Sequence, residues 1–265
     1  MNLEAIADIG ARERRTALFV LRSEIPLARG LAVMLHGRNG APDQPQIIEA
    51  AAVLARHGFN VLLPALPDSA ANSEAGTAGG AADRFTMTAH LADAAAVLDW
   101  VQKGGVGSIG APCTPLLLAG HSMGAYAALR LAAERQEAAS SAVLAISAVV
   151  SGAALLAARA AMGQPALDAL EREVPGATAE YAKQDLTPLA PRLTHPTAFL
   201  TGTRDGLTRP GDVAAFAARL SPAPLVETVP EAEHCPSGPA YAEALDRALA
   251  YLIVRWPALK RSNGA

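Results

Sequence analysis

Residues 116–125, LLLAGHSMGA, decide how this chain folds. An apolar run leads into a serine that lies between two glycines, and residues 126–131 then have the spacing of the first turns of a helix. A nucleophile at a strand-to-helix turn needs glycine at both flanking positions, because side chains at Gly120 and Gly124 would collide with the neighbouring strand and helix. The stretch therefore predicts that Ser122 is a nucleophile on a sharp turn, and the alternative is a purely structural connection.

Short strand-like runs alternate with longer helical segments along the rest of the chain. This alternation is typical of a mostly parallel sheet covered by helices on both faces, and we expect one domain over residues 1–265. The expected strands are 16–21, 31–35, 61–64, 115–119, 142–150, 197–201 and 225–229, and the expected helices include 45–57, 86–101 and 122–134.

Two segments interrupt the alternation. Residues 67–82 are rich in Ala, Gly, Ser and Asp without periodicity, which predicts a mobile loop. Residues 152–191 stand where another strand is expected, yet they are Ala-rich and broken at Gly163, Pro165 and Pro175-Gly176. We expect a small helical cap insertion over one edge of the sheet.

A serine nucleophile needs a base, and the base needs an orienting carboxylate, in the chain order serine, acid, histidine for this type of turn. Two histidines follow Ser122. His195 precedes a strand and belongs at the opposite end of the sheet, whereas His234 follows the last strand and is the expected base. Asp205 follows strand 197–201 in a turn and is the expected acid.

Acyl transfer also needs N–H groups that bind the developing oxyanion. The backbone N–H of Met123, directly after the nucleophile, is one expected donor. The loop that starts at His36-Gly37 is expected to supply the other, with Arg38 as the first candidate and Asn39 as the next. The alternative for this loop is a plain turn at the end of a strand.

These motifs together resemble the α/β-hydrolase superfamily over about residues 16–256. The resemblance implies the α/β-hydrolase fold, with a central sheet of about eight strands, and the catalytic triad Ser122, Asp205 and His234. It is strongest to compact serine esterases of the dienelactone-hydrolase or carboxylesterase type. Two departures are a serine where dienelactone enzymes use a cysteine, and a missing His-Gly-Gly-Gly loop.

The expected substrate is a small, apolar ester. The pocket is expected to draw on side chains from several loops and from the insertion: Arg38, Asn39, Phe85, Leu155, Leu156, Met162 and Leu207. The Arg38 guanidinium is also a candidate contact for an acidic substrate. Thioester, amide, lactone or carbon–carbon cleavage by the same triad remains open, as does a hydrolase-fold protein that binds a ligand without turnover.

Composition excludes several other classes. The formal net charge is −3 with scattered Lys and Arg, so we expect neither nucleic acid nor a membrane surface as a partner. Cys113 and Cys235 suit two reduced thiols in a cytoplasmic protein, and the oligomeric state stays open. We expect no metal, because the histidines lack ligand spacing. We expect no cofactor either, because Gly105–Gly110 follows a helix and precedes a strand, the reverse of a dinucleotide site.

Overall fold

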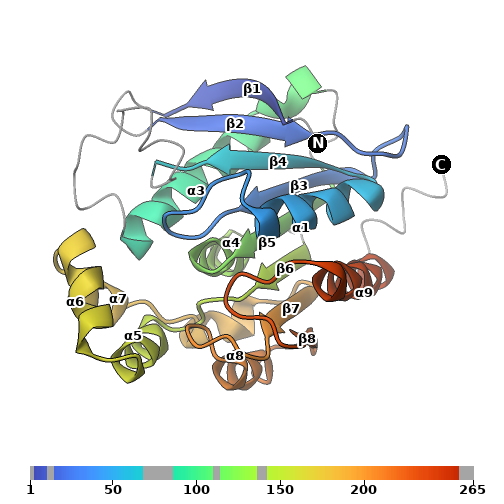
Figure 1. Cartoon of the computed structure of the whole chain (residues 1–265). Coiled ribbons are helices and arrows are strands. Elements are labelled where there is room, and N and C mark those ends of the chain that lie inside the picture. The colour runs from blue at the N-terminus through green and yellow to red at the C-terminus, as the bar shows by residue number, and fades with distance from the viewer. Residues whose placement is uncertain (1–2, 11–14, 68–85, 110–113, 136–141, 257–265) are drawn as a thin grey trace.

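The computed structural model describes residues 3–10, 15–67, 86–109, 114–135 and 142–256. Eight strands form one sheet in the order β1-β2-β4-β3-β5-β6-β7-β8 (Figure 1). β1 pairs antiparallel with β2, β2 pairs antiparallel with β4, and every other neighbouring pair is parallel. The strands are β1 (Glu4–Ile9), β2 (Thr16–Leu21), β3 (Gly30–Leu35), β4 (Phe59–Ala65), β5 (Leu116–His121), β6 (Ala142–Ile146), β7 (Thr197–Gly202) and β8 (Leu225–Val229).

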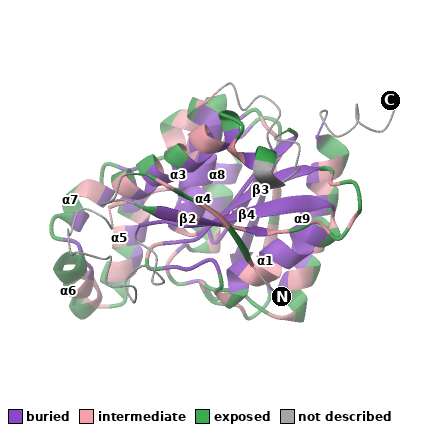
Figure 2. Ribbon diagram, turned by 90° about the horizontal axis from the view of Figure 1, so that it is seen from above, coloured by how far each residue is buried: buried purple, intermediate pink, exposed green. Residues whose placement is uncertain are grey.

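Helices cover both faces of this sheet. α1 (Pro45–Arg56) and α9 (Pro239–Arg255) bury one core against it, and α3 (Met87–Gln102), α4 (Met123–Glu134) and α8 (Pro210–Ala217) bury the other. The central strands are buried on both faces, as their continuous apolar runs require, and Figure 2 shows them enclosed between the helices. The predicted architecture is therefore confirmed. In the described ranges, no helix is both long enough and apolar enough to cross a membrane.

The segment between β6 and β7 is helical. It contains α5 (Gly152–Ala161), α6 (Gln164–Glu173), α7 (Ala177–Tyr181) and the 3-10 helix η4 (Thr187–Arg192). The breaks between α5, α6 and α7 fall at Gly163 and Gly176, which both have positive φ, close to the predicted positions. Figure 1 shows α5, α6 and α7 grouped to one side of the sheet.

Three expectations differ from the structure or fall outside it. The strand expected over 142–150 ends at Ile146, because Ser147 takes a positive φ of 45° and the buried chain turns out of the sheet. β1 was not expected, since its sequence lacks a clear alternation of apolar and polar residues, and none of its residues is fully buried. The loop expected over 67–82 lies outside the described residues from position 68 onward.

The connection between α3 and β5 agrees with the sequence-based expectation. It contains the short 3-10 helix η2 (Gly105–Ile109), so these glycines follow a helix and precede a strand. Between η2 and β5, the described residues contain no helix N-terminus of the kind that a dinucleotide pyrophosphate needs.

The parallel strands direct the loops that follow them to a single edge of the sheet. The loops after β3, β5, β6, β7 and β8 all leave from carboxyl ends, where open parallel sheets bind ligands. The described site residues that were predicted outside the helical segment lie in or directly beside these loops.

Candidate active site

Ser122 lies in a strained turn between β5 and α4. Its φ of 56° and ψ of −117° fall in a region that side-chain-bearing residues rarely adopt. A Cβ atom on Gly120 would lie 2.4 Å from the carbonyl carbon of Gly124, and one on Gly124 would lie 2.4 Å from the carbonyl oxygen of His36. Both glycines are therefore required by close backbone approach, as the spacing predicts.

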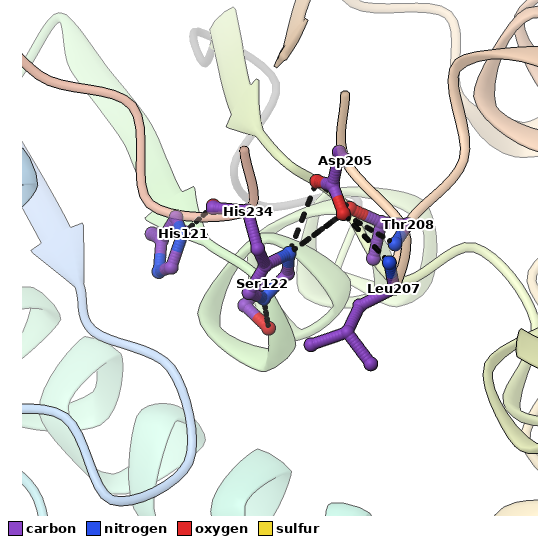
Figure 3. Close-up of polar contacts among 6 residues, drawn as sticks. All are labelled: His121, Ser122, Asp205, Leu207, Thr208 and His234. Atoms are coloured by element: carbon purple, nitrogen blue, oxygen red, sulfur yellow. Dashed lines mark hydrogen bonds and ion pairs between the residues drawn. The ribbon is translucent and has the colours of Figure 1, made fainter. Parts of the chain in front are cut away.

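Ser122, His234 and Asp205 form a continuous hydrogen-bonded chain (Figure 3). The Ser122 hydroxyl lies 2.9 Å from His234 Nε2, and His234 Nδ1 lies 3.0 Å from Asp205 Oδ2. In this arrangement the hydroxyl donates to Nε2, while Nδ1–H donates to the carboxylate. The three residues come from the loops after β5, β7 and β8. The sheet edge therefore brings Ser122 and Asp205 together although they are more than 80 positions apart in the sequence.

Asp205 is buried, and all of its recorded partners are donors. Its carboxylate accepts hydrogen bonds from the backbone N–H groups of Leu207 and Thr208, from the Thr208 hydroxyl at 2.6 Å, and from His234. Burial by itself would raise the pKa of this carboxyl, but the hydrogen bond and charge of His234 and the two Thr208 donors outweigh it and lower the pKa to about 2. Asp205 is therefore ionised at neutral pH.

Backbone hydrogen bonds join the loop that carries Asp205 to the loop that carries His234. The N–H of Thr203 donates to the Val229 carbonyl at 3.0 Å, and the N–H of Arg204 donates to the Ala232 carbonyl at 2.9 Å. Since both loops leave adjacent parallel strands, these bonds extend the sheet pairing beyond the strands themselves. The distance between acid and imidazole is set by backbone, which is stiffer than side chains alone.

His121 supports the same imidazole from behind. It is buried, and its Nε2–H donates to the backbone carbonyl of His234 at 2.8 Å, with the two rings 5.0 Å apart (Figure 3). Burial, reinforced by the nearby His234, lowers the pKa of His121 to about 4. His121 is thus neutral at neutral pH and is packed against the His234 loop.

Two backbone regions near Ser122 could donate to an oxyanion. Met123 is the first residue of α4, so its N–H precedes the intrahelical hydrogen bonds. The loop after β3 is ordered by His36, which donates from Nδ1 to the Gly37 carbonyl at 2.7 Å and accepts from the Leu66 N–H at Nε2. Arg38 follows in this loop and lines the same cavity as Ser122 and Met123.

A cavity of about 140 Å³ opens beside the Ser122 hydroxyl. Its lining combines the sheet edge with the helical segment: Arg38, Ser122, Met123, Val149, Leu155, Arg159, Tyr181, Leu207 and His234. Four of the expected pocket or oxyanion residues, Arg38, Met123, Leu155 and Leu207, are thus brought together. The cavity is smaller than the pockets of several hundred Å³ that hold drug-sized ligands, so it suits a small group.

Three expected pocket residues in the described part of the chain are not part of this lining, and a fourth cannot be placed. Asn39 is exposed and takes a positive φ of 54° in the turn after Arg38. Leu156, the next residue of α5, packs against the hydrophobic core that contains Leu155 but does not line the cavity. Met162, at the end of α5, is 54% exposed. Phe85 lies outside the described residues.

Val149, Arg159 and Tyr181 line the cavity although sequence reasoning did not single them out. Val149 was placed in a strand, whereas it lies in the buried turn after β6. Arg159 follows Leu155 by four residues, so the helical spacing could have indicated that both share one face. In the described part of the chain, no group of three or more His, Cys, Asp and Glu side chains is arranged to hold a metal ion.

Residues 32–262 match a family described as "Alpha/beta hydrolase family". A search of curated protein sequences gave no match.

Solved structures with the same architecture include several esterases. Est1E from Butyrivibrio proteoclasticus has 16% identity and a TM-score of 0.71, and the match covers 95% of this chain and 100% of its own. A second structure of Est1E, with bound ferulic acid, also has a TM-score of 0.71. An esterase from Pyrococcus furiosus has 16% identity and a TM-score of 0.67 over 96% of this chain and 91% of its own. Dienelactone hydrolase from Anabaena variabilis has 17% identity and a TM-score of 0.64 over 96% and 98%. At such identities the likeness shows the fold alone.

Proposed function

The chain belongs to the alpha/beta hydrolase family, and from that premise we propose that it is a serine hydrolase that cleaves a carboxylic ester of a small substrate. The observation that carries this proposal is the unbroken chain of hydrogen bonds from the Ser122 hydroxyl through His234 to the ionised Asp205. Hydroxyl, imidazole and carboxylate in this order make up the machinery of acyl transfer.

The reaction proceeds in two acyl-transfer steps. His234 Nε2 takes the proton of Ser122 as Oγ attacks the ester carbonyl, and Asp205 holds the ring and stabilises the imidazolium. The imidazolium then protonates the leaving alcohol, which leaves an acyl group on Ser122. Water, deprotonated by the same imidazole, attacks this ester, and the acid departs as Ser122 regains its proton.

The negative oxygen that forms in each step requires preorganised donors. The backbone N–H groups of Met123 and Arg38 fill this role in our proposal, because both residues line the cavity with Ser122. The loop of Arg38 is held by the buried His36, and Met123 is held by its position at the start of α4. Donors fixed in this way need no rearrangement as charge develops.

The shape and lining of the cavity support a small acyl group. Val149, Leu155 and Leu207 provide apolar wall, and the volume of about 140 Å³ leaves little room for a bulky chain. We propose that α5, α6 and α7 form a cap within a single domain, since Leu155, Arg159 and Tyr181 reach the cavity from this segment. Cys235 has an exposed free thiol. Such a thiol is compatible with the reducing cytoplasm, which we propose as the location of the protein.

Hydrolysis of p-nitrophenyl esters tests this proposal. The wild-type protein should hydrolyse short-chain and medium-chain esters, and Ser122→Ala should reduce kcat/KM by roughly 10⁴-fold or more, because the residual rate then depends on binding and oxyanion donors only. Unchanged turnover by the purified variant would sink the assignment.

Other bonds remain as alternatives for the same machinery. Thioesters, amides, lactones and activated carbon–carbon bonds also pass through an attack by serine, and the bond is selected by the cavity rather than by the triad. A panel of matched thioester, amide and lactone substrates separates these activities. A protein that only binds a ligand would hydrolyse none of them.

A further inference from the structure

Arg159 lies on the third turn of α5, with its side chain at the cavity beside Ser122. α5 begins at the cap residue Ser151, whose hydroxyl accepts from the Ala154 N–H, and Leu155 and Arg159 follow on one face of the helix. Both of these side chains line the cavity. The helix itself is tied down at its start, where the Gly152 N–H donates to the Gln184 carbonyl at 2.7 Å. The position of Arg159 at the cavity is therefore set by an anchored element.

The Arg159 guanidinium forms no ion pair within the described residues, although the Glu173 carboxylate lies near enough to favour its charged form. Its Nε is buried, and within the described part of the chain it has no hydrogen-bond partner. The other cavity arginine differs, because Arg38 is paired with Glu173 of α6. Burial, reinforced by the nearby Arg38, lowers the pKa of Arg159, and the opposing effects of Tyr181 and Glu173 do not offset it. A partly buried cation without a partner is costly in a folded protein, and a bound anion would offset that cost.

We propose that Arg159 binds a carboxylate carried by the substrate, so that the preferred substrate is a half-ester of a small dicarboxylic acid. This inference rests on the proposed esterase function, because it places the ester carbonyl at Ser122 while the free carboxylate meets Arg159. The apolar side chains Val149 and Leu155 line the same cavity and suit the methylene groups that join the two ends. A guanidinium presents N–H groups in a fork that matches a carboxylate.

The comparison of two substrates of nearly equal shape tests this assignment. Monoethyl glutarate and ethyl valerate carry the same ethyl ester, but the first ends in a carboxylate where the second ends in a methyl group. The wild-type protein should have the higher kcat/KM for monoethyl glutarate, as measured by titration of the released acid at constant pH. Arg159→Met should lower the ratio of the two kcat/KM values by roughly 10- to 100-fold, mainly through the KM of monoethyl glutarate.

Two further variants separate a charge effect from damage to the fold. Arg159→Lys retains a cation and should restore part of the preference for monoethyl glutarate. Arg192→Met removes an exposed arginine from η4, away from the cavity lining, and should leave the ratio at its wild-type value. An equal loss of activity toward both esters in Arg159→Met, with no recovery in Arg159→Lys, would overturn the inference.

The failure of this inference is distinguishable from failure of the proposed function. If Ser122→Ala loses both activities while Arg159→Met leaves the ratio unchanged, the esterase assignment stands and the role of Arg159 is refuted. If Ser122→Ala retains both activities, the proposed function itself is refuted.

Discussion

The loops at the sheet edge and helix α5 both line the cavity beside Ser122, but their polar side chains are bonded very differently. At the sheet edge, Asp205 accepts hydrogen bonds from three residues, and His234 is engaged at both ring nitrogens. On α5, the buried Nε of Arg159 has no partner within the described part of the chain. The difference teaches that the side chains proposed for chemistry are preorganised by hydrogen bonds. The side chain proposed for substrate selection instead has a buried donor that a bound ligand would pair.

The largest expected effect comes from breaking the preorganised side. Asp205→Asn keeps the size of the side chain but replaces the acceptor that faces His234 Nδ1–H with an amide, which favours the wrong tautomer of the imidazole. We expect kcat for p-nitrophenyl butyrate to fall by about 10⁴-fold with the fold retained. Asp246→Asn on α9, whose carboxylate pairs with His57 and Arg56, is the matched control and should retain full activity. A loss of less than tenfold in Asp205→Asn would show that the carboxylate does not orient the base.

The next effect concerns the packing beneath His234. The pKa of His121 is about 4 in the folded chain against an ordinary value of 6.5, so the unfolded chain binds more protons between these values. The resulting stabilisation is fully present above about pH 6.5 and is lost as the pH falls toward 4, by about 3 kcal/mol in total. His121→Gln can still donate to the His234 carbonyl but does not titrate.

Urea unfolding at pH 7 and pH 4.5 measures this difference. The wild-type protein should lose more free energy of unfolding between the two pH values than His121→Gln does. Asp205 does not contribute in this window, because its pKa is lowered from 3.8 to about 2 and its stabilisation is lost only as the pH falls from about 3.8 to 2. Equal losses in the two proteins would show that His121 is not buried as a neutral ring.

The smallest expected effect comes from the helical side. Glu173→Gln removes the ion-pair partner of Arg38, but the Glu173 side chain is 51% exposed, so the pair is screened by water. We expect a change below about 1 kcal/mol in the free energy of unfolding and a change within about threefold in kcat/KM for ethyl valerate. Glu4→Gln on β1 breaks an exposed ion pair with Arg22 and is the control, because the Glu4 side chain is exposed to a similar degree as that of Glu173. A tenfold drop in kcat/KM for Glu173→Gln alone would mean that the pair holds the Arg38 loop in place.

The same two regions differ in how far the sequence predicts them. The turn at Ser122 could be predicted because both glycines are dictated by backbone contacts below 3 Å, which leave one residue type. Asp205 and His234 could be predicted because strand order places their loops at one edge. These constraints depend on neighbouring residues or on the order of the strands, so the positions of residues along the sequence are enough to predict them.

The cavity wall could be predicted only in part. Leu155 and Leu207 were expected at the cavity and line it, but Leu156 and Met162, close by in the sequence, do not. Which face of α5 meets the cavity depends on how that helix is anchored to Gln184, a contact that no periodicity encodes. The turn at Ser147 is a second example, because an apolar run through Val150 fits a longer strand as well as a buried loop.

The most direct test of the central claim is the site of covalent labelling by a fluorophosphonate probe, located by peptide mass spectrometry. We predict one adduct per chain, on Ser122 of the wild-type protein, with labelling abolished in Ser122→Ala and strongly slowed in Asp205→Asn. An adduct on another residue, or no adduct on the folded wild-type protein, would contradict it.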